Sequence, residues 1–271
     1  MAHAEHCFGI DVMAPGYSNL YCGRRVAITG AGGSLGLALL RAFHGCGASL
    51  VALTSSPEPL ALVSAEGDPI TLEQHRWRCG AEAELRDLLK DIDVFVINHG
   101  INAHGDRSQA AQALSLEVNA LSSLRWLELF AAATPDGPAA HEPGSPPRPR
   151  REVWINTSEA EILPAGSPLY EISKRLLGQL LSLRALDLAG PQLRIRRLVL
   201  GPFRSNLNPI GLMGAAFVAG AVLRLAALDF GLIIVSPNPL TYVLMPLVVL
   251  VRWLYLGLFS RQAQPGAALP D

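Results

Sequence analysis

Charge of either sign is scarce in this sequence. Only 17% of its 271 residues are charged, and the 22 basic and 23 acidic side chains leave a formal net charge of −1. Proteins that bind nucleic acid usually carry a strong basic field, so this balance argues against a nucleic-acid partner. Half of the residues are hydrophobic, which is enough to build one large α/β domain.

Patterns of disulfides and metal ligands are also lacking. The four cysteines contain no CxxC pair, and no apolar leader with a cleavage site opens the chain, so we expect a reduced, cytoplasmic setting. His3, His6 and Cys7 lie close together, but no second pair of ligands stands at a spacing typical of zinc. We therefore predict no metal site and an irregular arm over residues 1–23.

Candidate strands and helices alternate through most of the remaining chain. Strand-like runs occupy 25–29, 48–53, 94–97, 152–156 and 193–200, and helix-like patterns occupy 35–43, 81–90, 114–133 and 169–188. This alternation predicts an α/β fold with a doubly wound parallel sheet, in a single domain over residues 24–236. Residues 134–151 are dense in proline and glycine and carry several arginines, so we expect a solvated surface loop without a function of its own.

A long apolar run covers residues 240–259 and is about long enough to span a bilayer. Pro246 and Arg252 lie inside it, and a central arginine is costly in lipid. We favour an in-plane helix or hairpin at the membrane surface, with the Arg252 guanidinium among the headgroups. Packing on the domain, on a second subunit or over a substrate pocket is the alternative, and a true span is the least favoured. We treat residues 237–271 as an apolar C-terminal helical extension and tail.

A glycine-rich turn joins the first predicted strand to the first predicted helix. It contains Thr29, Gly30, Gly33, Ser34, Leu35 and Gly36. Glycines in this setting let a pyrophosphate approach the backbone amides at a helix N-terminus. Tight packing of strand on helix is the purely structural alternative. The turn predicts a dinucleotide site in a Rossmann-type fold.

The chain has only two lysines, Lys90 and Lys174, and the second stands four residues after Tyr170. On a helix this spacing puts a phenol and an ammonium on one face. The cation can favour the phenolate and bring the pKa of the tyrosine from about 10 toward neutrality. Tyr170 and Lys174 are therefore a candidate acid/base pair.

The glycine turn and the YxxxK pair together resemble the short-chain dehydrogenase/reductase family, over about residues 24–207. Ser34 stands where the commoner family pattern has a glycine, which matches the TGxxGxxG form of extended and atypical members. The resemblance implies the family's catalytic tetrad, with Thr157 as an alternative to the serine. The tetrad residues are Asn119, Ser158, Tyr170 and Lys174.

The resemblance also implies a mechanism. Tyr170 would transfer the hydroxyl proton while hydride moves between the nicotinamide and a carbonyl or alcohol carbon. Ser158 would hydrogen-bond the developing oxyanion, and Lys174 would lower the pKa of Tyr170 and hold the nicotinamide ribose. Asn119 would link Lys174 to solvent through a water molecule.

Further cofactor contacts are implied by similarity to the family's NNAG and PG motifs. They are Asn98, Gly100, Gly201, Pro202 and Ser205. Ser205 would bind the nicotinamide carboxamide. His99, which replaces a residue of NNAG, either donates to a ligand or packs beside the strand end, and packing is the commoner case. Glu159 and Glu161 either recognise a polar substrate group or are solvated loop carboxylates, again the commoner case.

The end of the second predicted strand favours NADP(H) over NAD(H). An NAD enzyme usually has an acidic residue there, against the ribose hydroxyls. This chain has Thr54 and Ser55 instead, whose hydroxyls can bond a 2′-phosphate without repelling it. No lysine or arginine stands in that turn to strengthen the preference.

Four runs, INHGIN, INTSEAE, SPLYEISKR and LGPFRSNLNPIG, resemble more narrowly the dehydrogenase portion of bifunctional sterol desaturase/short-chain dehydrogenases. The histidine boxes of a desaturase are not present, so we expect no desaturation. We expect an NAD(P)-dependent oxidoreductase for a small, lipophilic substrate, with peripheral membrane contact through 240–259 and a homo-oligomer as possibilities. A cofactor-binding scaffold with little catalysis is the alternative. A nucleotide-sugar epimerase is a third and less favoured interpretation.

Overall fold

The computed structural model describes residues 20–134 and 149–261. Its centre is a sheet of seven parallel strands in the order β3-β2-β1-β4-β5-β6-β7, which confirms the predicted doubly wound fold. The strands are β1 Arg25–Thr29, β2 Ser49–Thr54, β3 Glu73–Arg76, β4 Val94–Ile97, β5 Arg151–Asn156, β6 Leu193–Leu200 and β7 Leu232–Val235. The strand order reverses between β1 and β4, which is where sheets of this type bind ligands.

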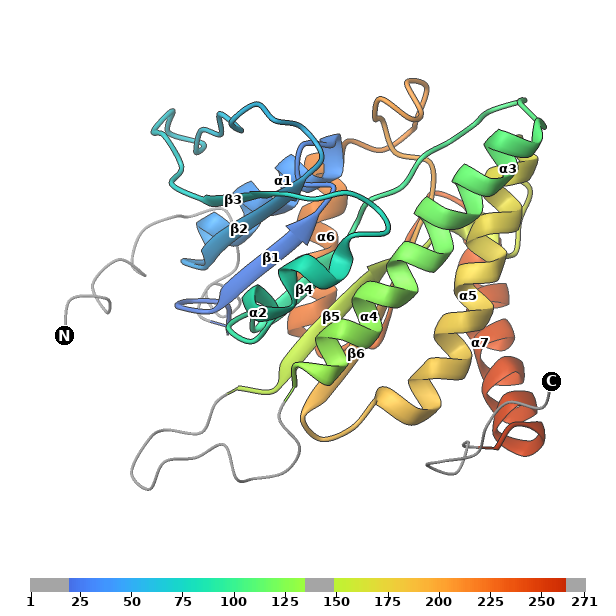
Figure 1. Cartoon of the computed structure of the whole chain (residues 1–271). Coiled ribbons are helices and arrows are strands. Elements are labelled where there is room, and N and C mark those ends of the chain that lie inside the picture. The colour runs from blue at the N-terminus through green and yellow to red at the C-terminus, as the bar shows by residue number, and fades with distance from the viewer. Residues whose placement is uncertain (1–19, 135–148, 262–271) are drawn as a thin grey trace.

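Helices cover both faces of the sheet (Figure 1). They are α1 Ser34–Gly45, α2 Arg86–Leu89, α3 Gln109–Leu116, α4 Ser122–Ala132, α5 Pro168–Leu188, α6 Ala215–Ala227 and α7 Pro239–Phe259. α1 and α6 pack together on one face, α4 and α5 pack together on the other, and α7 lies outside α5.

The central strands are buried on both faces. Val26 and Ile28 of β1 belong to the core beneath α1 and α6, whereas Ala27 belongs to the core beneath α4 and α5. Residues of β4 alternate in the same way. Strands of this kind read as short continuous apolar runs, which is why their positions follow from the sequence.

Several elements differ from the sequence prediction. The helix expected over 114–133 consists of α3, a π-helical turn over Glu117–Leu121 and α4. The helix expected over 81–90 is a 3-10 turn over Glu82–Leu85 followed by the short α2. The edge strand β3 is not indicated by the sequence pattern, because its residues EQHR are all polar.

α7 is one continuous helix, and Pro246 does not interrupt it. Within the described residues it is the one helix long and apolar enough to cross a membrane by length and composition. The predicted N-terminal arm with His3, His6 and Cys7 and most of the proline-rich loop lie outside the described residues.

Candidate active site

The turn between β1 and α1 presents backbone amides at the carboxyl edge of the sheet. Gly30 has φ +63°, and a Cβ there would lie 2.9 Å from His99 Cα. A Cβ at Gly36 would lie 2.3 Å from the Gly30 carbonyl oxygen. The tight turn therefore requires these glycines. α1 also begins without a side-chain cap and without an acidic residue in its first turn, so its first amides are open to an anionic group such as a pyrophosphate.

Thr29 joins this turn to the end of β4. Its hydroxyl oxygen accepts hydrogen bonds from the amides of Asn98 and His99 at 2.9 and 3.3 Å, and it lies 2.9 Å from His99 Nδ1. His99 packs edge-on against Trp77 with ring centres 4.9 Å apart. Burial lowers the pKa of His99 to about 3, so the imidazole is neutral at physiological pH. This supports the packing interpretation of His99.

Tyr170 lies in the first turn of α5, beside Ser158, which follows β5. Ser158 Oγ donates to the Leu200 carbonyl oxygen at 3.4 Å and accepts from the Ala160 amide at 3.2 Å. Burial raises the pKa of Tyr170, the nearby Ser158 hydroxyl opposes that rise, and the charge of Glu159 adds to it. The net direction is opposite to the predicted lowering; Lys174 Nζ lies 5.7 Å from the Tyr170 ring centre. Tyr170 is thus a neutral phenol, the form that can donate a proton.

Lys174 is buried between α5 and the end of β5. Its Nζ donates to the Asn156 carbonyl oxygen at 3.0 Å, and Asn156 Nδ2 donates to Asn98 Oδ1 at 2.9 Å. Burial lowers the pKa of Lys174 to about 8, opposed by the charge of Glu161, so the ammonium persists below about pH 8. The sequence analysis missed Asn156, although a polar residue that ends the apolar strand VWIN is a signal that could have found it.

Asn119 lies fully buried in the π-helical turn between α3 and α4. Its Oδ1 accepts from the Ile101 amide at 2.8 Å, and its Nδ2 donates to the Ile101 carbonyl oxygen at 3.0 Å and to Ser173 Oγ at 2.9 Å. π-helical turns inside α-helices often occur at functional sites. Asn119 thus holds the segment after β4 against α5. Gly100 leaves the space beside it, because a Cβ there would lie 3.1 Å from Asn119 Oδ1.

The predicted contacts after β6 follow Leu200, whose carbonyl oxygen accepts from Ser158 Oγ at 3.4 Å. Gly201 packs tightly, since a Cβ there would lie 2.6 Å from Ser236 Oγ. Pro202 follows it, and its carbonyl oxygen accepts from the Leu212 amide at 2.9 Å. Ser205 lies in a turn in which its Oγ accepts from the Asn208 amide at 3.2 Å. In this structure, therefore, the Ser205 hydroxyl stabilises the turn to which Ser205 itself belongs.

A cation that the sequence analysis missed stands beside Thr54 and Ser55. The register of β2 and β3 pairs Thr54 with Arg76, and Arg76 Nε donates to the Ser55 carbonyl oxygen at 3.3 Å. Next to them is a cavity of about 470 Å³ lined by Ser56, Pro57, Pro59, Gln74 and Arg76. A guanidinium beside hydroxyl groups is suited to a phosphate. The sequence of the turn alone does not indicate Arg76, because that residue belongs to a different strand, β3.

Glu159 connects the segment after Ser158 to the start of α7. Its Oε2 accepts from Ser236 Oγ at 2.5 Å and from Thr241 Oγ1 at 3.0 Å. Thr241 is fully buried in the first turns of α7. This structural role differs from both interpretations that the sequence suggested for Glu159.

Glu161 is buried and paired with two arginines. Its Oε2 lies 2.7 Å from Arg252 Nη1 of α7 and 3.3 Å from Arg197 Nη1 of β6. The expectation of a solvated carboxylate is wrong here, and so is the expectation that Arg252 lies at lipid headgroups. Both failures have one cause: the two side chains neutralise each other in the interior.

No family model matches the chain. Solved structures do. A short-chain dehydrogenase from Burkholderia cenocepacia in complex with NADP has a TM-score of 0.67 at 19% identity, over 89% of this chain and 99% of that one. This protein has the short-chain dehydrogenase/reductase fold. A short-chain dehydrogenase from Sphingobium yanoikuyae in complex with NADPH agrees, with a TM-score of 0.64 at 16% identity over 90% of this chain and 98% of that one.

A curated protein is similar in sequence as well. The monoglucosyldiacylglycerol epimerase of Synechocystis sp. is 43% identical over 242 residues, which are 89% of this chain and 56% of the relative. The chain therefore spans about half the length of that relative. The predicted resemblance to short-chain dehydrogenases/reductases is confirmed, whereas the narrower resemblance to bifunctional sterol desaturases stays a prediction.

Proposed function

We propose that this protein transfers hydride reversibly between NADP(H) and a secondary alcohol or ketone carbon of a lipid-linked substrate. The observation that carries this proposal is the group Tyr170, Ser158 and Lys174 at the carboxyl ends of β4 and β5. A proton donor, a hydroxyl partner and an ammonium meet there, next to the amide-lined turn of α1. The arrangement suits removal or delivery of a hydroxyl proton beside a bound dinucleotide.

Each residue of the candidate site has a separate role in the proposed reaction. NADP, when bound, accepts or supplies the hydride. Tyr170 gives its proton to the ketone oxygen as the alcohol forms and takes one back in the reverse direction, while Ser158 donates a hydrogen bond to that oxygen. Lys174 provides a positive charge that favours the phenolate left behind.

The lipid-linked substrate is argued from the relative named monoglucosyldiacylglycerol epimerase. Inversion of a secondary alcohol needs the same chemistry twice. The carbon loses hydride and the hydroxyl loses a proton to give a ketone, and both return on the opposite face of the carbon. Such a reaction consumes no net cofactor. Epimerisation of a glycolipid sugar is thereby the favoured form of the oxidoreductase, in place of the nucleotide-sugar epimerase that was the least favoured interpretation of the sequence.

This function can be tested with vesicles that contain monoglucosyldiacylglycerol. The purified protein and a trace of NADP⁺ should yield the epimeric glycolipid, separated by chromatography, with no net change in nicotinamide absorbance. If lipophilic ketones oxidise NADPH but no epimer forms, the proposed hydride transfer is supported and the glycolipid is excluded as the substrate. If neither reaction occurs, the enzyme proposal fails and the cofactor-binding scaffold remains.

Cofactor preference should depend on Arg76. Arg76→Ala is expected to weaken NADPH binding about ten-fold or more, because a charge-assisted contact to the 2′-phosphate is worth about 1.5–3 kcal/mol, while NADH binding stays unchanged. Titration of tryptophan fluorescence with each nucleotide measures both. Arg86→Ala, which removes an exposed arginine of α2, is the control for the loss of one charge. Equal weakening of both nucleotides by Arg76→Ala would exclude a 2′-phosphate contact.

A further inference from the structure

α7 is attached to the domain through its single charged side chain, Arg252. Arg252 Nη1 lies 2.7 Å from Glu161 Oε2, and both atoms lie against Gly178 of α5, which has no side chain to fill this space. A Cβ at Gly178 would lie 1.8 Å from Glu161 Oε2 and 2.7 Å from Arg252 Nη1. This buried ion pair determines which side of α7 faces the protein.

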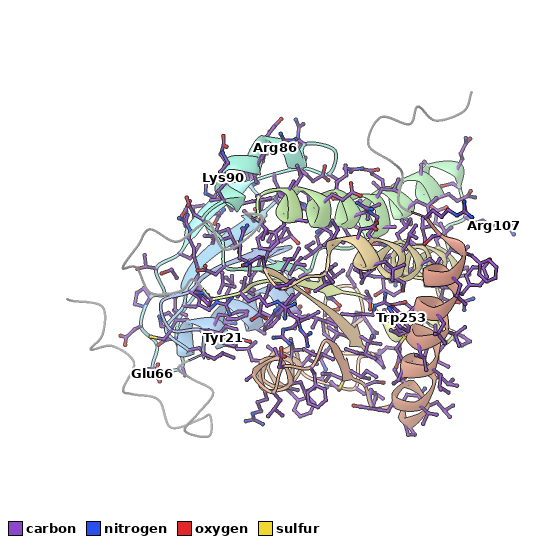
Figure 2. All side chains as sticks on the ribbon, turned by 90° about the horizontal axis from the view of Figure 1, so that it is seen from below. Tyr21, Glu66, Arg86, Lys90, Arg107 and Trp253 are labelled. Carbon is purple, nitrogen blue, oxygen red and sulfur yellow. The ribbon has the colours of Figure 1, made fainter. Side chains whose placement is uncertain are left out.

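The opposite side of α7 is apolar and exposed. The helix buries Thr241 and Met245 fully, but only 11% of its most apolar 18-residue window is buried, at a mean hydropathy of 1.9. Figures 1 and 2 both place the helix at the edge of the molecule. We call the exposed large side chains the outer face; they are Leu240, Tyr242, Val243, Leu244, Leu247, Leu250, Val251, Trp253, Leu254, Tyr255, Leu258 and Phe259.

We propose that the outer face of α7 docks on the surface of a lipid bilayer, with the helix axis in the membrane plane. The proposal rests on the proposed function in one respect, because a lipid-linked substrate resides in that bilayer. The start of α7 is joined to the active site, since Thr241 Oγ1 donates to Glu159, the residue after Ser158. A bilayer on the outer face would therefore lie beside the site that receives the substrate.

Two features favour a bilayer over a second protein chain or a span. The outer face has no charged side chain, whereas protein interfaces are rimmed by polar groups that pair with the partner. Trp253 and Tyr255 carry polar ring atoms on this face, and such rings favour the boundary between headgroups and acyl chains. The Tyr242 hydroxyl instead donates to the Ser236 carbonyl oxygen at 3.2 Å. A span would have to break the pair between Arg252 and Glu161 and carry the arginine into lipid, which is costly.

Trp253 gives a direct readout of docking. It is 57% exposed, while the other three tryptophans of the chain, Trp77, Trp126 and Trp154, are at most 7% exposed; Figure 2 labels it beside α7. The full chain is mixed with phosphatidylcholine vesicles that carry bromine on the acyl chain, without substrate or cofactor. We expect fluorescence quenching that is strongest for bromine near the headgroups, and no quenching in Trp253→Phe.

Paired variants test the face itself. Leu247→Glu/Leu254→Glu should reduce flotation with phosphatidylcholine vesicles about ten-fold or more, because charged side chains partition poorly into the membrane. Leu114→Glu/Leu228→Glu adds the same charge at exposed positions outside α7 and should float like the original protein. Three results would overturn the proposal: no flotation of the original protein, quenching strongest at the bilayer centre, or a dimer that only the first variant dissociates. Flotation and fluorescence quenching are measured without substrate or cofactor. A protein that fails to transfer hydride can therefore still show membrane docking, so the two proposals are tested separately.

Discussion

Tyr170→Phe is expected to lower turnover by about 10²- to 10⁴-fold, the range that positioned acid/base groups contribute, while NADPH still binds. The substitution keeps the aromatic ring in α5 and removes only the hydroxyl near Ser158. The ketone oxygen then has no proton donor in place, although the ammonium of Lys174 and the turn of α1 are unaltered. Initial rates with the glycolipid, together with nucleotide titration on the same sample, separate chemistry from binding.

Tyr21→Phe is the matched control for Tyr170→Phe. Tyr21 is buried and packs on Phe43 and Trp154, and its hydroxyl has no hydrogen-bond partner among the described residues. It lies before β1, at the amino end of that strand, whereas the glycine turn follows the carboxyl end. Its loss should leave turnover unchanged. Wild-type turnover in Tyr170→Phe would assign the proton transfer to another group.

Glu161→Gln is expected to lower the free energy of unfolding by about 3–5 kcal/mol, the cost of breaking a buried ion pair from one side. The glutamine has nearly the same shape but leaves the guanidinium groups of Arg197 and Arg252 without their common anion. Urea unfolding at neutral pH, followed by circular dichroism, measures the loss. Because domains of this kind are stable by only about 5–15 kcal/mol, the variant should be markedly fragile.

Asp87→Asn is the control for Glu161→Gln. Asp87 pairs with Lys90 on the surface at 2.7 Å, with both side chains mostly exposed, and such exposed pairs contribute little to stability. The double variant Glu161→Gln/Arg252→Met should lose less than the sum of its two single variants, since the second substitution removes a charge that the first leaves unpaired. Strict additivity would mean that Glu161 and Arg252 do not interact in solution.

The two expected results concern one short segment of the chain. Ser158, Glu159 and Glu161 follow β5 within five positions. Ser158 contacts Tyr170, while Glu159 and Glu161 contact α7. The candidate residue Ser158 and the outer apolar helix α7 are therefore joined by the same 3-10 turn, Glu159–Glu161.

Local features of the sequence were sufficient to predict five of the seven strands, all except β3 and β7, and most of the candidate site. The central strands are apolar on both faces, so their runs are visible without the fold. The turn from Thr29 to Gly36 and the helical spacing of Tyr170 and Lys174 are encoded within a few residues. Patterns with a period set by backbone geometry can be read locally, because each residue's neighbours in space are also its neighbours in sequence.

By itself, then, the sequence determined the doubly wound sheet, the glycine turn and the Tyr170–Lys174 pair. Only the tertiary structure decided the surroundings of Arg76 and Arg252. Arg76 reaches Ser55 because two parallel strands pair, and Arg252 meets Glu161 across 91 positions of chain. A charged residue in an apolar run has no local pattern that reveals its partner. Its cost of burial is offset by whichever opposite charge the fold brings within reach, and that is settled by packing alone.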